Sequence, residues 1–280
     1  MQVFTEIAQL RDFLDLLNSG AKSVGFVPTM GALHEGHLSL IRYSLRDCDH
    51  TIASIFVNPE QFNNPDDLRH YPRTLEDDLN MLKEIGCDAV FTPSVEEMYP
   101  EQPTGKFNFG HLDKVMEGKH RPGHFNGVAI VVKRLFEIVK PDRAFFGQKD
   151  FQQLAIIKAM VKMLKLPIEI IACPIIREQD GLAMSSRNVR LTKDERELAP
   201  VIYKSLTSIK DGFTRLTLEE IHHLISQRIN SISGMKLEYF EIVDPLTLLP
   251  LTSKDASPHC IACIALFLGE VRLIDNMMLN

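Results

Sequence analysis

Two histidines three positions apart, His34 and His37, could bind and protonate an anionic ligand together. They form an H-x-G-H motif in a loop that follows a short apolar run, and we expect a helix from residue 37 onward. Beyond the carboxyl end of a strand, a helix N-terminus attracts phosphate through its free N–H groups and its dipole. Because Gly36 permits a tight turn and a close backbone approach, the two imidazoles could converge on one anion. The motif therefore predicts a phosphate-binding loop.

Other interpretations of this motif are less compatible with the sequence. A zinc site is a poor fit, because the H-E-x-x-H pattern places its histidines four apart on a helix, whereas these lie three apart across a loop. Two surface histidines without a function remain an alternative. The sequence contains neither G-x-x-x-x-G-K-[ST] nor G-x-G-x-x-G, which argues against kinase-type and dinucleotide-binding sites. What remains is the H-x-G-H arrangement of enzymes that attack the α-phosphate of ATP.

A second loop, Met184–Asn188, supplies two hydroxyls and a guanidinium in succession. These groups are hydrogen-bond donors that can follow pyrophosphate as it leaves. Taken alone, S-S-R-N is an ordinary loop sequence. It gains meaning because it follows the last strand that we expect in the sheet.

Polar residues also follow two other expected strands. Asn58 and Gln61 come after one, and Lys149 and Gln153 come after another. Side-chain amides suit hydroxyl and carboxylate ligands because they both donate and accept hydrogen bonds, and Lys149 is a point charge near a helix start, where a phosphate would lie. For the three amides, roles in a turn or on a helix surface are equally compatible with the sequence.

Two further patterns have ordinary structural explanations. The acidic run Glu76–Asp78 could contribute to Mg²⁺ binding, but an acidic first turn also compensates the helix dipole. Cys260 and Cys263 form a C-x-x-C within an apolar run and lack a second pair, so we expect them to be core residues.

The apolar pattern predicts an α/β fold. Short apolar strands alternate with helices, which is typical of a parallel sheet covered on both faces. The expected strands are Val24–Pro28, Thr51–Val57, Ala89–Phe91, Arg143–Phe146 and Ile168–Cys173, and the expected helices are 37–46, Arg73–Ile85, Val128–Val139 and Leu154–Leu164. We assign this pattern to a first domain, residues 1–175.

The pattern changes in the rest of the chain, residues 176–280, where helices are followed by strands. This order predicts a separate, smaller α+β domain. Its expected helices are Thr192–Lys210 and Leu218–Ile232, and its expected strands are Lys236–Val243, Cys260–Leu268 and Val271–Ile274.

Composition excludes several classes of protein. The 280 residues are 45% hydrophobic and 24% charged, which is typical of a globular chain. No apolar run reaches the ~18–20 residues of a membrane helix, and no signal peptide is evident, so we expect a cytoplasmic protein without a membrane partner. A net charge of −6 argues against nucleic-acid binding. The five cysteines are an odd number in mostly apolar surroundings, which predicts reduced, buried thiols.

Several of these segments together resemble the pantoate–β-alanine ligase (pantothenate synthetase) family. The segments are Pro28–His37, Phe56–Phe62, Tyr71–Thr74, Arg121–Phe125, Gly147–Gln153 and Gly181–Asn188. The resemblance implies a Rossmann-like nucleotidyltransferase domain of the HIGH type and a C-terminal domain that acts as a lid. It also implies a homodimer, the use of ATP with Mg²⁺, the substrates (R)-pantoate and β-alanine, and the products pantothenate, AMP and pyrophosphate.

The resemblance also implies residue roles. His37 takes the position of a proton donor, Gln61 of a ligand to pantoate and β-alanine, Gln153 of a second pantoate ligand, and Asp77 of a magnesium-linked acid. Asn58 is grouped with the substrate ligands. The implied ATP contacts are Met30, Gly31, Ala32, Leu33, His34, Glu35, Gly36, His37, Gly147, Gln148, Lys149, Asp150, Ile176, Met184, Ser185, Ser186 and Arg187. Two departures from the family pattern are Gln148, where Glu is expected, and Phe151, where Tyr is common.

The implied chemistry agrees with the residue types. The pantoate carboxylate would attack the α-phosphorus of ATP, and the β-alanine amine would then displace AMP from the acyl adenylate. This needs orientation and charge stabilisation rather than a side-chain nucleophile. The donors expected to supply them, and so to act as the catalytic set, are His34, His37, Lys149, Ser185, Ser186 and Arg187. Two alternatives stay open, namely a nucleotidylyltransferase of the same fold and a nucleotide-binding regulatory module without turnover.

Overall fold

The computed structural model describes residues 1–18 and 22–280, which form two compact units. The first unit comprises residues 1–114, 118–148 and 153–174. The second comprises residues 175–280 together with two short segments from earlier in the chain, 115–117 and 149–152. Each unit has its own hydrophobic core.

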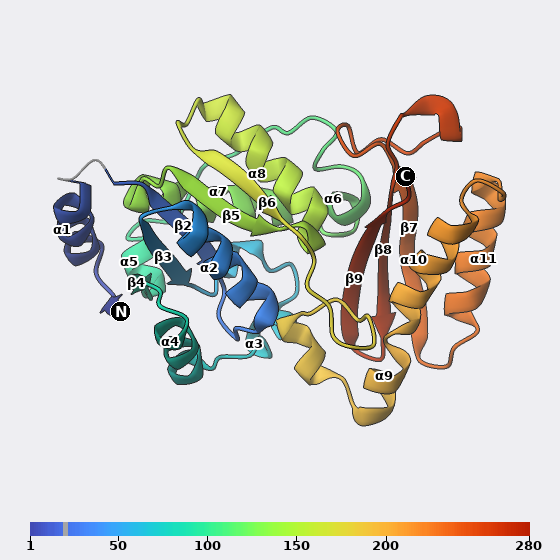
Figure 1. The fold of residues 1–280 in the computed structure, drawn as a ribbon, viewed down its shortest axis with the longest axis horizontal. Helices are drawn as coiled ribbons and strands as arrows, with labels where there is room; N and C mark the ends of the chain where they lie inside the picture. The colour runs from blue at the N-terminus through green and yellow to red at the C-terminus, as the bar shows by residue number, and fades with distance from the viewer. Residues whose placement is uncertain (19–21) are drawn as a thin grey trace. The chain divides into compact units, whose positions relative to one another are not determined.

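The first unit is built on a six-stranded sheet in which every pair of neighbouring strands is parallel. The strands are β1 (Gln2–Phe4), β2 (Val24–Thr29), β3 (His50–Ile55), β4 (Ala89–Phe91), β5 (Arg143–Gly147) and β6 (Glu169–Cys173), in the order β1-β4-β3-β2-β5-β6 (Figure 1). From β2 the chain builds outward to β3 and β4 on one side and later to β5 and β6 on the other. The strand order therefore reverses between β2 and β5, where open α/β sheets bind ligands. The predicted parallel α/β fold is confirmed.

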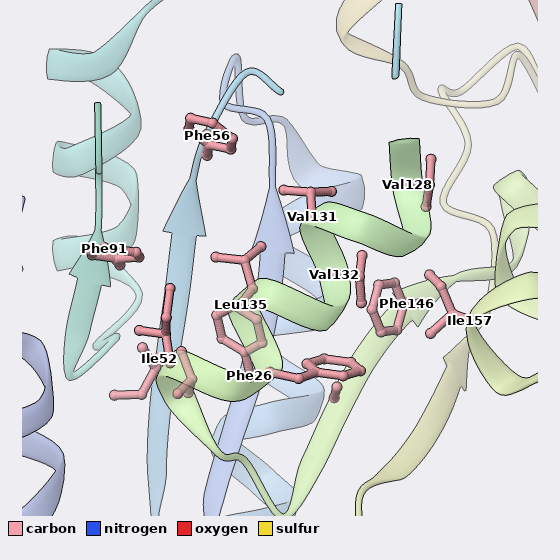
Figure 2. Packing of buried hydrophobic residues seen from close by; sticks show 14 of the residues in the cluster. Phe26, Ile52, Phe56, Phe91, Val128, Val131, Val132, Leu135, Phe146 and Ile157 are labelled. Carbon is pink, nitrogen blue, oxygen red and sulfur yellow. The ribbon is translucent and has the colours of Figure 1, made fainter. Parts of the chain in front are cut away.

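Both faces of this sheet are buried, as the continuous apolar strands predict. Successive residues of β2, Phe26 and Val27, belong to different core clusters, one on each face. Figure 2 shows the first cluster, in which Phe26 and Phe146 of the sheet pack near Val132 and Leu135 of a long helix. Helices therefore cover both faces of the sheet.

The helices along this part of the chain extend the sequence prediction. They are α1 (Ile7–Asn18), α2 (Glu35–Asp47), α3 (Pro65–Arg69), α4 (Leu75–Glu84), α5 (Val95–Met98), α6 (Met116–His120), α7 (His124–Val139) and α8 (Phe151–Leu164), with the 3₁₀ turns η1 (Pro59–Gln61) and η2 (Gln148–Asp150). The apolar pattern missed β1, α1 and the short helices α3, α5 and α6. It also placed the starts of α7 and α8 too late, at Val128 and Leu154, because polar residues occupy their first turns and interrupt the apolar stripe.

The second unit packs helices with a three-stranded antiparallel sheet, and the predicted α+β class is confirmed. Its strands are β7 (Met235–Val243), β8 (Ile261–Leu268) and β9 (Val271–Met278), and its helices are α9 (Lys193–Leu198), α10 (Val201–Gly212) and α11 (Leu218–Asn230), with the 3₁₀ turns η3 (Ser186–Arg190) and η4 (Lys254–Ala256). The single helix predicted over Thr192–Lys210 is wrong. Two helices form instead, because Pro200 has no N–H to continue the first.

Three observations bear on the remaining predictions from composition. Cys260 and Cys263 are free and buried in the core of the second unit, as expected. Burial raises the pKa of Cys263, which keeps this thiol protonated. In the part of the chain that the structure describes, no helix is long and apolar enough to cross a membrane.

Candidate active site

The H-x-G-H segment forms the start of α2. His34 is the N-cap, and its Nδ1 accepts a hydrogen bond of 3.1 Å from the N–H of Gly36. An imidazole nitrogen that accepts carries no proton, so in the neutral ring the proton lies on Nε2, which can donate to an anion. The helix begins two residues earlier than predicted because of this cap, and His37 therefore lies in its first turn rather than in the loop. The rings of His34 and His37 are 4.1 Å apart between centroids.

This geometry changes how the segment would bind phosphate. The N–H of Gly36 is used by His34 Nδ1, and the N–H of His37 donates to the His34 carbonyl at 2.8 Å. An anion would therefore be contacted through the imidazoles rather than through these two main-chain groups. The expectation that free N–H groups of the helix hold the phosphate is corrected to this extent.

A buried carboxylate holds the loop between β2 and α2. Asp78, on α4 and 1% exposed, accepts hydrogen bonds from the N–H groups of Ala32 at 2.9 Å and Leu33 at 2.8 Å. It also accepts from the hydroxyl of Thr74 at 3.1 Å. The loop needs this support because Gly31 and Ala32 have φ of +79° and +49°, and the left-handed region is unfavourable for alanine.

Sequence reasoning missed this role of Asp78. It grouped the residue with Glu76 and Asp77 as an acidic first turn, but the structure buries Asp78 against the loop and leaves Glu76 and Asp77 exposed. Each α-helical residue is rotated by about 100° from the last, so adjacent acids point in different directions. No local signal distinguishes them.

At the end of β3, Asn58 and Gln61 are buried and bonded to each other. The Asn58 amide nitrogen donates to Gln61 Oε1 at 3.0 Å and to the Gly127 carbonyl at 3.2 Å. Its oxygen accepts from the hydroxyl of Tyr99 at 3.0 Å and from the N–H of Glu60 at 3.3 Å. Burial raises the pKa of Tyr99, so its hydroxyl stays a donor. These four bonds fill the hydrogen-bonding capacity of the Asn58 side chain.

The Gln61 amide is thereby given a fixed direction. Because its oxygen accepts from Asn58, its nitrogen points the other way and lies 3.1 Å from the sulfur of Met30. Met30 follows β2 and Gln61 follows β3, so the structure brings the ends of these two strands together.

The main chain at Gln61 is held by a second buried residue, His124. Its Nδ1 lies 2.7 Å from the Gln61 carbonyl, and its Nε2 lies 3.1 Å from the guanidinium of Arg121. Arginine only donates and a carbonyl only accepts, so His124 is the neutral tautomer with its proton on Nδ1. Gly127 allows α7 to approach, because a Cβ there would lie 2.1 Å from the Glu60 carbonyl oxygen. The sequence showed Arg121–Phe125 as a matching segment without indicating this function.

The remaining predicted residues of the first unit follow β5. Gly147 ends the strand, Gln148 begins the 3₁₀ turn η2, and Gln153 is half-buried in the first turn of α8. Since β2, β3 and β5 are neighbours in a parallel sheet, their carboxyl ends lie along one edge. The first unit therefore gathers Met30–His37, the Asn58–Gln61 pair and the end of β5 at the point where the strand order reverses.

The second unit holds the other predicted ATP contacts. The Nζ atom of Lys149 lies 3.7 Å from Oδ2 of Asp150. Ile176 and Met184 are paired across a hairpin, named here the strap (residues 176–184), in which the N–H of Met184 donates to the Ile176 carbonyl at 3.0 Å. Ser185 follows as the cap of η3, accepting from the N–H of Arg187 at 3.3 Å. The strap therefore leads directly into the Ser185–Arg187 segment.

The turn of the strap is stabilised by an ion pair. Asp180 lies 2.6 Å from the guanidinium of Arg196 on α9. The hydrogen bond from Arg196 lowers the pKa of Asp180, so the carboxylate stays ionised at neutral pH.

The arrangement of acids bears on metal binding. Among the described residues, no group of three or more His, Cys, Asp or Glu side chains could hold a metal ion. Asp77 is exposed in the first turn of α4. A lone carboxylate fits Mg²⁺, which usually takes one or two carboxylates together with substrate phosphates and waters.

Fold and site together define a class of protein. A parallel sheet of Rossmann strand order with an H-x-G-H loop at its reversal point is typical of an α/β enzyme that acts on a nucleotide. The chain belongs to the pantoate-beta-alanine ligase family, whose model matches residues 2–278.

Similarity to known proteins extends over nearly the full length. The chain is 51% identical over 277 residues to a pantothenate synthetase of Porphyromonas gingivalis, with 99% of each chain covered. It is 49% identical to one of Bacteroides fragilis, covering 99% of this chain and 98% of that protein. These relatives set aside both alternatives left open by the sequence, and the chain is an enzyme with the activity of this family, the ATP-dependent joining of pantoate and β-alanine.

Solved structures agree. Pantothenate synthetase from Thermus thermophilus is 42% identical with a TM-score of 0.93, covering 100% of this chain and 99% of that one. The pantoate-beta-alanine ligase of Francisella tularensis, described as complexed with beta-gamma ATP and beta-alanine, is 38% identical with a TM-score of 0.85, covering 100% and 98%.

Proposed function

We propose that this enzyme makes pantothenate through a pantoyl adenylate, with its two sets of polar residues dividing the work. The observation that carries the proposal is the His34 cap, which puts the proton of the neutral ring on Nε2 and holds this ring beside that of His37 at the start of α2. Donors of this kind stabilise negative charge that develops on a phosphate during attack at the α-phosphorus. His37 is assigned as the proton donor.

The pantoate subsite is assigned to Gln61 and Gln153. The direction of the Gln61 amide, with its NH₂ group turned away from Asn58 and toward Met30, suits a carboxylate or hydroxyl oxygen on that side. Asn58 serves this subsite through Gln61, because its own side-chain bonds are all made within the protein. Gln61 is also assigned a contact with β-alanine.

ATP is assigned to four segments. The loop Met30–His37 contacts the phosphates through its imidazoles. The second segment is Gly147, Gln148, Lys149 and Asp150, the third is Ile176 and Met184 of the strap, and the fourth is Ser185–Arg187. Lys149 and the Ser185–Arg187 segment follow pyrophosphate as it leaves, since they provide cationic and hydroxyl donors. The β-alanine amine then displaces AMP, and no side chain of the enzyme becomes covalently modified. The Francisella structure, complexed with beta-gamma ATP and beta-alanine, supports ATP and β-alanine as ligands here.

Mg²⁺ is assigned to Asp77. When bound, the ion would neutralise charge on the phosphates of ATP. The exposed carboxylate of Asp77 can serve this purpose, whereas Asp78 is already occupied by the loop.

The resemblance to the family supports two further assignments, a homodimer and a cytoplasmic location. Light scattering tests the first directly. The protein should elute with twice the mass of the 31.8 kDa chain, and a single-chain mass would contradict the dimer.

An exchange assay tests the proposed chemistry. With pantoate and ATP but no β-alanine, the enzyme should move label between pyrophosphate and ATP. His37→Ala should lower this exchange by ~10²–10³-fold, as expected for loss of one transition-state donor. The matched control is His223→Ala, an exposed histidine on α11, which should exchange normally. Exchange without pantoate, or a folded His37→Ala variant with normal exchange, would contradict the proposal.

A further inference from the structure

Two adjacent residues of the last strand, Asp275 and Asn276, are polar and buried, at 4% and 6% exposure. Successive strand residues point to opposite faces, so one strand can reach two different segments. Both lie in the second unit, with the segments that they contact. Neither takes part in the proposed chemistry.

Asn276 contacts the main chain of Lys149. Its amide nitrogen donates to the Lys149 carbonyl oxygen at 2.9 Å, across 127 residues of sequence. The ammonium group of a lysine lies at the end of a flexible four-carbon side chain. The region that it can reach therefore depends on where the main chain of that residue is held. This hydrogen bond fixes the base of that side chain.

Asp275 contacts the strap. Its two carboxylate oxygens accept from the guanidinium of Arg177 at 2.7 and 3.0 Å, which is a bidentate pair. The same guanidinium donates to the Gly181 carbonyl at 3.1 Å and lies over the ring of Tyr203, 4.4 Å from its centroid. Through the side chain of Arg177, Asp275 is thereby linked to the first arm of the strap and to its turn.

Strand β9 also supports the other end of the Lys149 segment. Gln152 donates to the Val115 carbonyl at 2.9 Å and accepts from the N–H of Glu117 at 2.9 Å. Glu117 in turn accepts from Arg272 of β9 at 2.7 and 2.8 Å. Segment 149–152 is thus held at its start by Asn276 and at its end, through Glu117, by Arg272.

We propose that Asn276 is a positioning residue for Lys149. Through Asn276 and Asp275, β9 fixes the positions of Lys149 and the strap relative to each other. This inference rests on the proposed function, which assigns ATP contacts to both segments. Orientation of this kind contributes to rate by keeping donors where charge develops in the transition state.

A double-mutant cycle on adenylate formation tests the inference. Asn276→Ala should lower pantoate-dependent pyrophosphate–ATP exchange about five- to tenfold, the size expected for one lost hydrogen bond. In a Lys149→Ala background, the same substitution should change exchange less than about twofold, because the residue that it positions is gone. The reaction of preformed pantoyl adenylate with β-alanine should be unchanged by Asn276→Ala, since pyrophosphate has already left.

The matched control is Asn280→Ala. Asn280 also donates to a main-chain carbonyl of the second unit, that of Pro258 at 3.2 Å, but contacts no predicted ATP residue. It should exchange like the wild type. Asn276→Ser, which keeps a polar group in place, replaces Asn276→Ala if the latter does not fold.

The outcomes separate this inference from the proposed function. A defective Lys149→Ala beside a normal Asn276→Ala would overturn the inference alone. Equal effects of Asn276→Ala with and without Lys149, or equal losses in both half-reactions, would show a general structural role and would also overturn it. A normal Lys149→Ala would contradict the assignment of Lys149 itself, and the inference with it.

Discussion

The loop after β2 in the first unit and the strap in the second unit both carry predicted ATP contacts, and both are held by a buried carboxylate distant in sequence. Asp78 holds the first with hydrogen bonds from two main-chain N–H groups and a hydroxyl. Asp275 holds the second through a bidentate pair with Arg177. One carboxylate orders the main chain directly, and the other acts through a cation.

This difference determines what each carboxylate contributes. Replacing Asp275 leaves a mostly buried guanidinium, 19% exposed, without its counter-charge. Replacing Asp78 leaves neutral donors unsatisfied. Desolvated charge is more costly than desolvated N–H, so the strap should depend on its carboxylate more strongly than the loop does.

The largest expected effect is that of Asp275→Asn on stability. The free energy of unfolding should fall by about 3 kcal/mol, the lower end of the cost of breaking a buried ion pair. Urea unfolding measures it. The matched control, Asp180→Asn, breaks the ion pair between Asp180 of the same strap and Arg196 of α9. This pair is more exposed, so its loss should lower the free energy of unfolding by at most about 1 kcal/mol. Equal losses in the two variants would contradict the comparison.

The second-largest effect on stability is expected for Asp78→Asn. The substitution keeps the shape but turns one acceptor into an NH₂ group that faces an N–H donor, so unfolding free energy should fall by about 1–3 kcal/mol. Pantoate-dependent exchange should fall as well, because the loop that carries His34 loses its shape. Unchanged stability together with unchanged exchange would show that Asp78 does not hold the loop.

A smaller effect, of opposite sign, is expected for Ala32→Gly. Residue 32 has φ of +49°, which glycine adopts without a steric penalty, so stability should rise by up to about 1 kcal/mol. In the Asp78→Asn background the same change should restore part of the lost exchange. If Ala32→Gly lowers exchange further in that background, backbone strain is not what Asp78 offsets.

The smallest effect on stability is expected for Asp77→Asn. Asp77 is exposed, so unfolding free energy should change by less than about 0.5 kcal/mol. A Mg²⁺ titration of exchange should nevertheless move to higher metal concentration. A wild-type titration curve would remove Asp77 from the proposed magnesium site.

The local parts of the fold and site were predictable from the sequence, because their signals are local. Short apolar runs identified five strands of the first sheet, and the H-x-G-H motif lies after β2, as predicted. The supporting carboxylates were not predictable. Asp78 and Asp77 are adjacent and equally acidic, and only the packing of α4 decides which one faces the loop.

Strand β9 shows the same limit. The predicted strand ended at Ile274 because Asp275 and Asn276 break its apolar pattern, whereas the structure continues it to Met278. Polar residues remain in this strand because their partners are 98 and 127 residues away in sequence. Hydrophobic periodicity is a local property of the chain and does not reveal contacts between residues so far apart in sequence.

Hydrogen exchange of single amides, with and without a non-hydrolysable ATP analogue, tests most directly whether buried carboxylates shape the site before ATP arrives. The N–H groups of Ala32 and Leu33 should be protected in the free enzyme, should change little when the analogue binds, and should lose protection in Asp78→Asn. Exchange of both amides at unprotected rates in the free enzyme, with protection only when the analogue is bound, would contradict this role of Asp78.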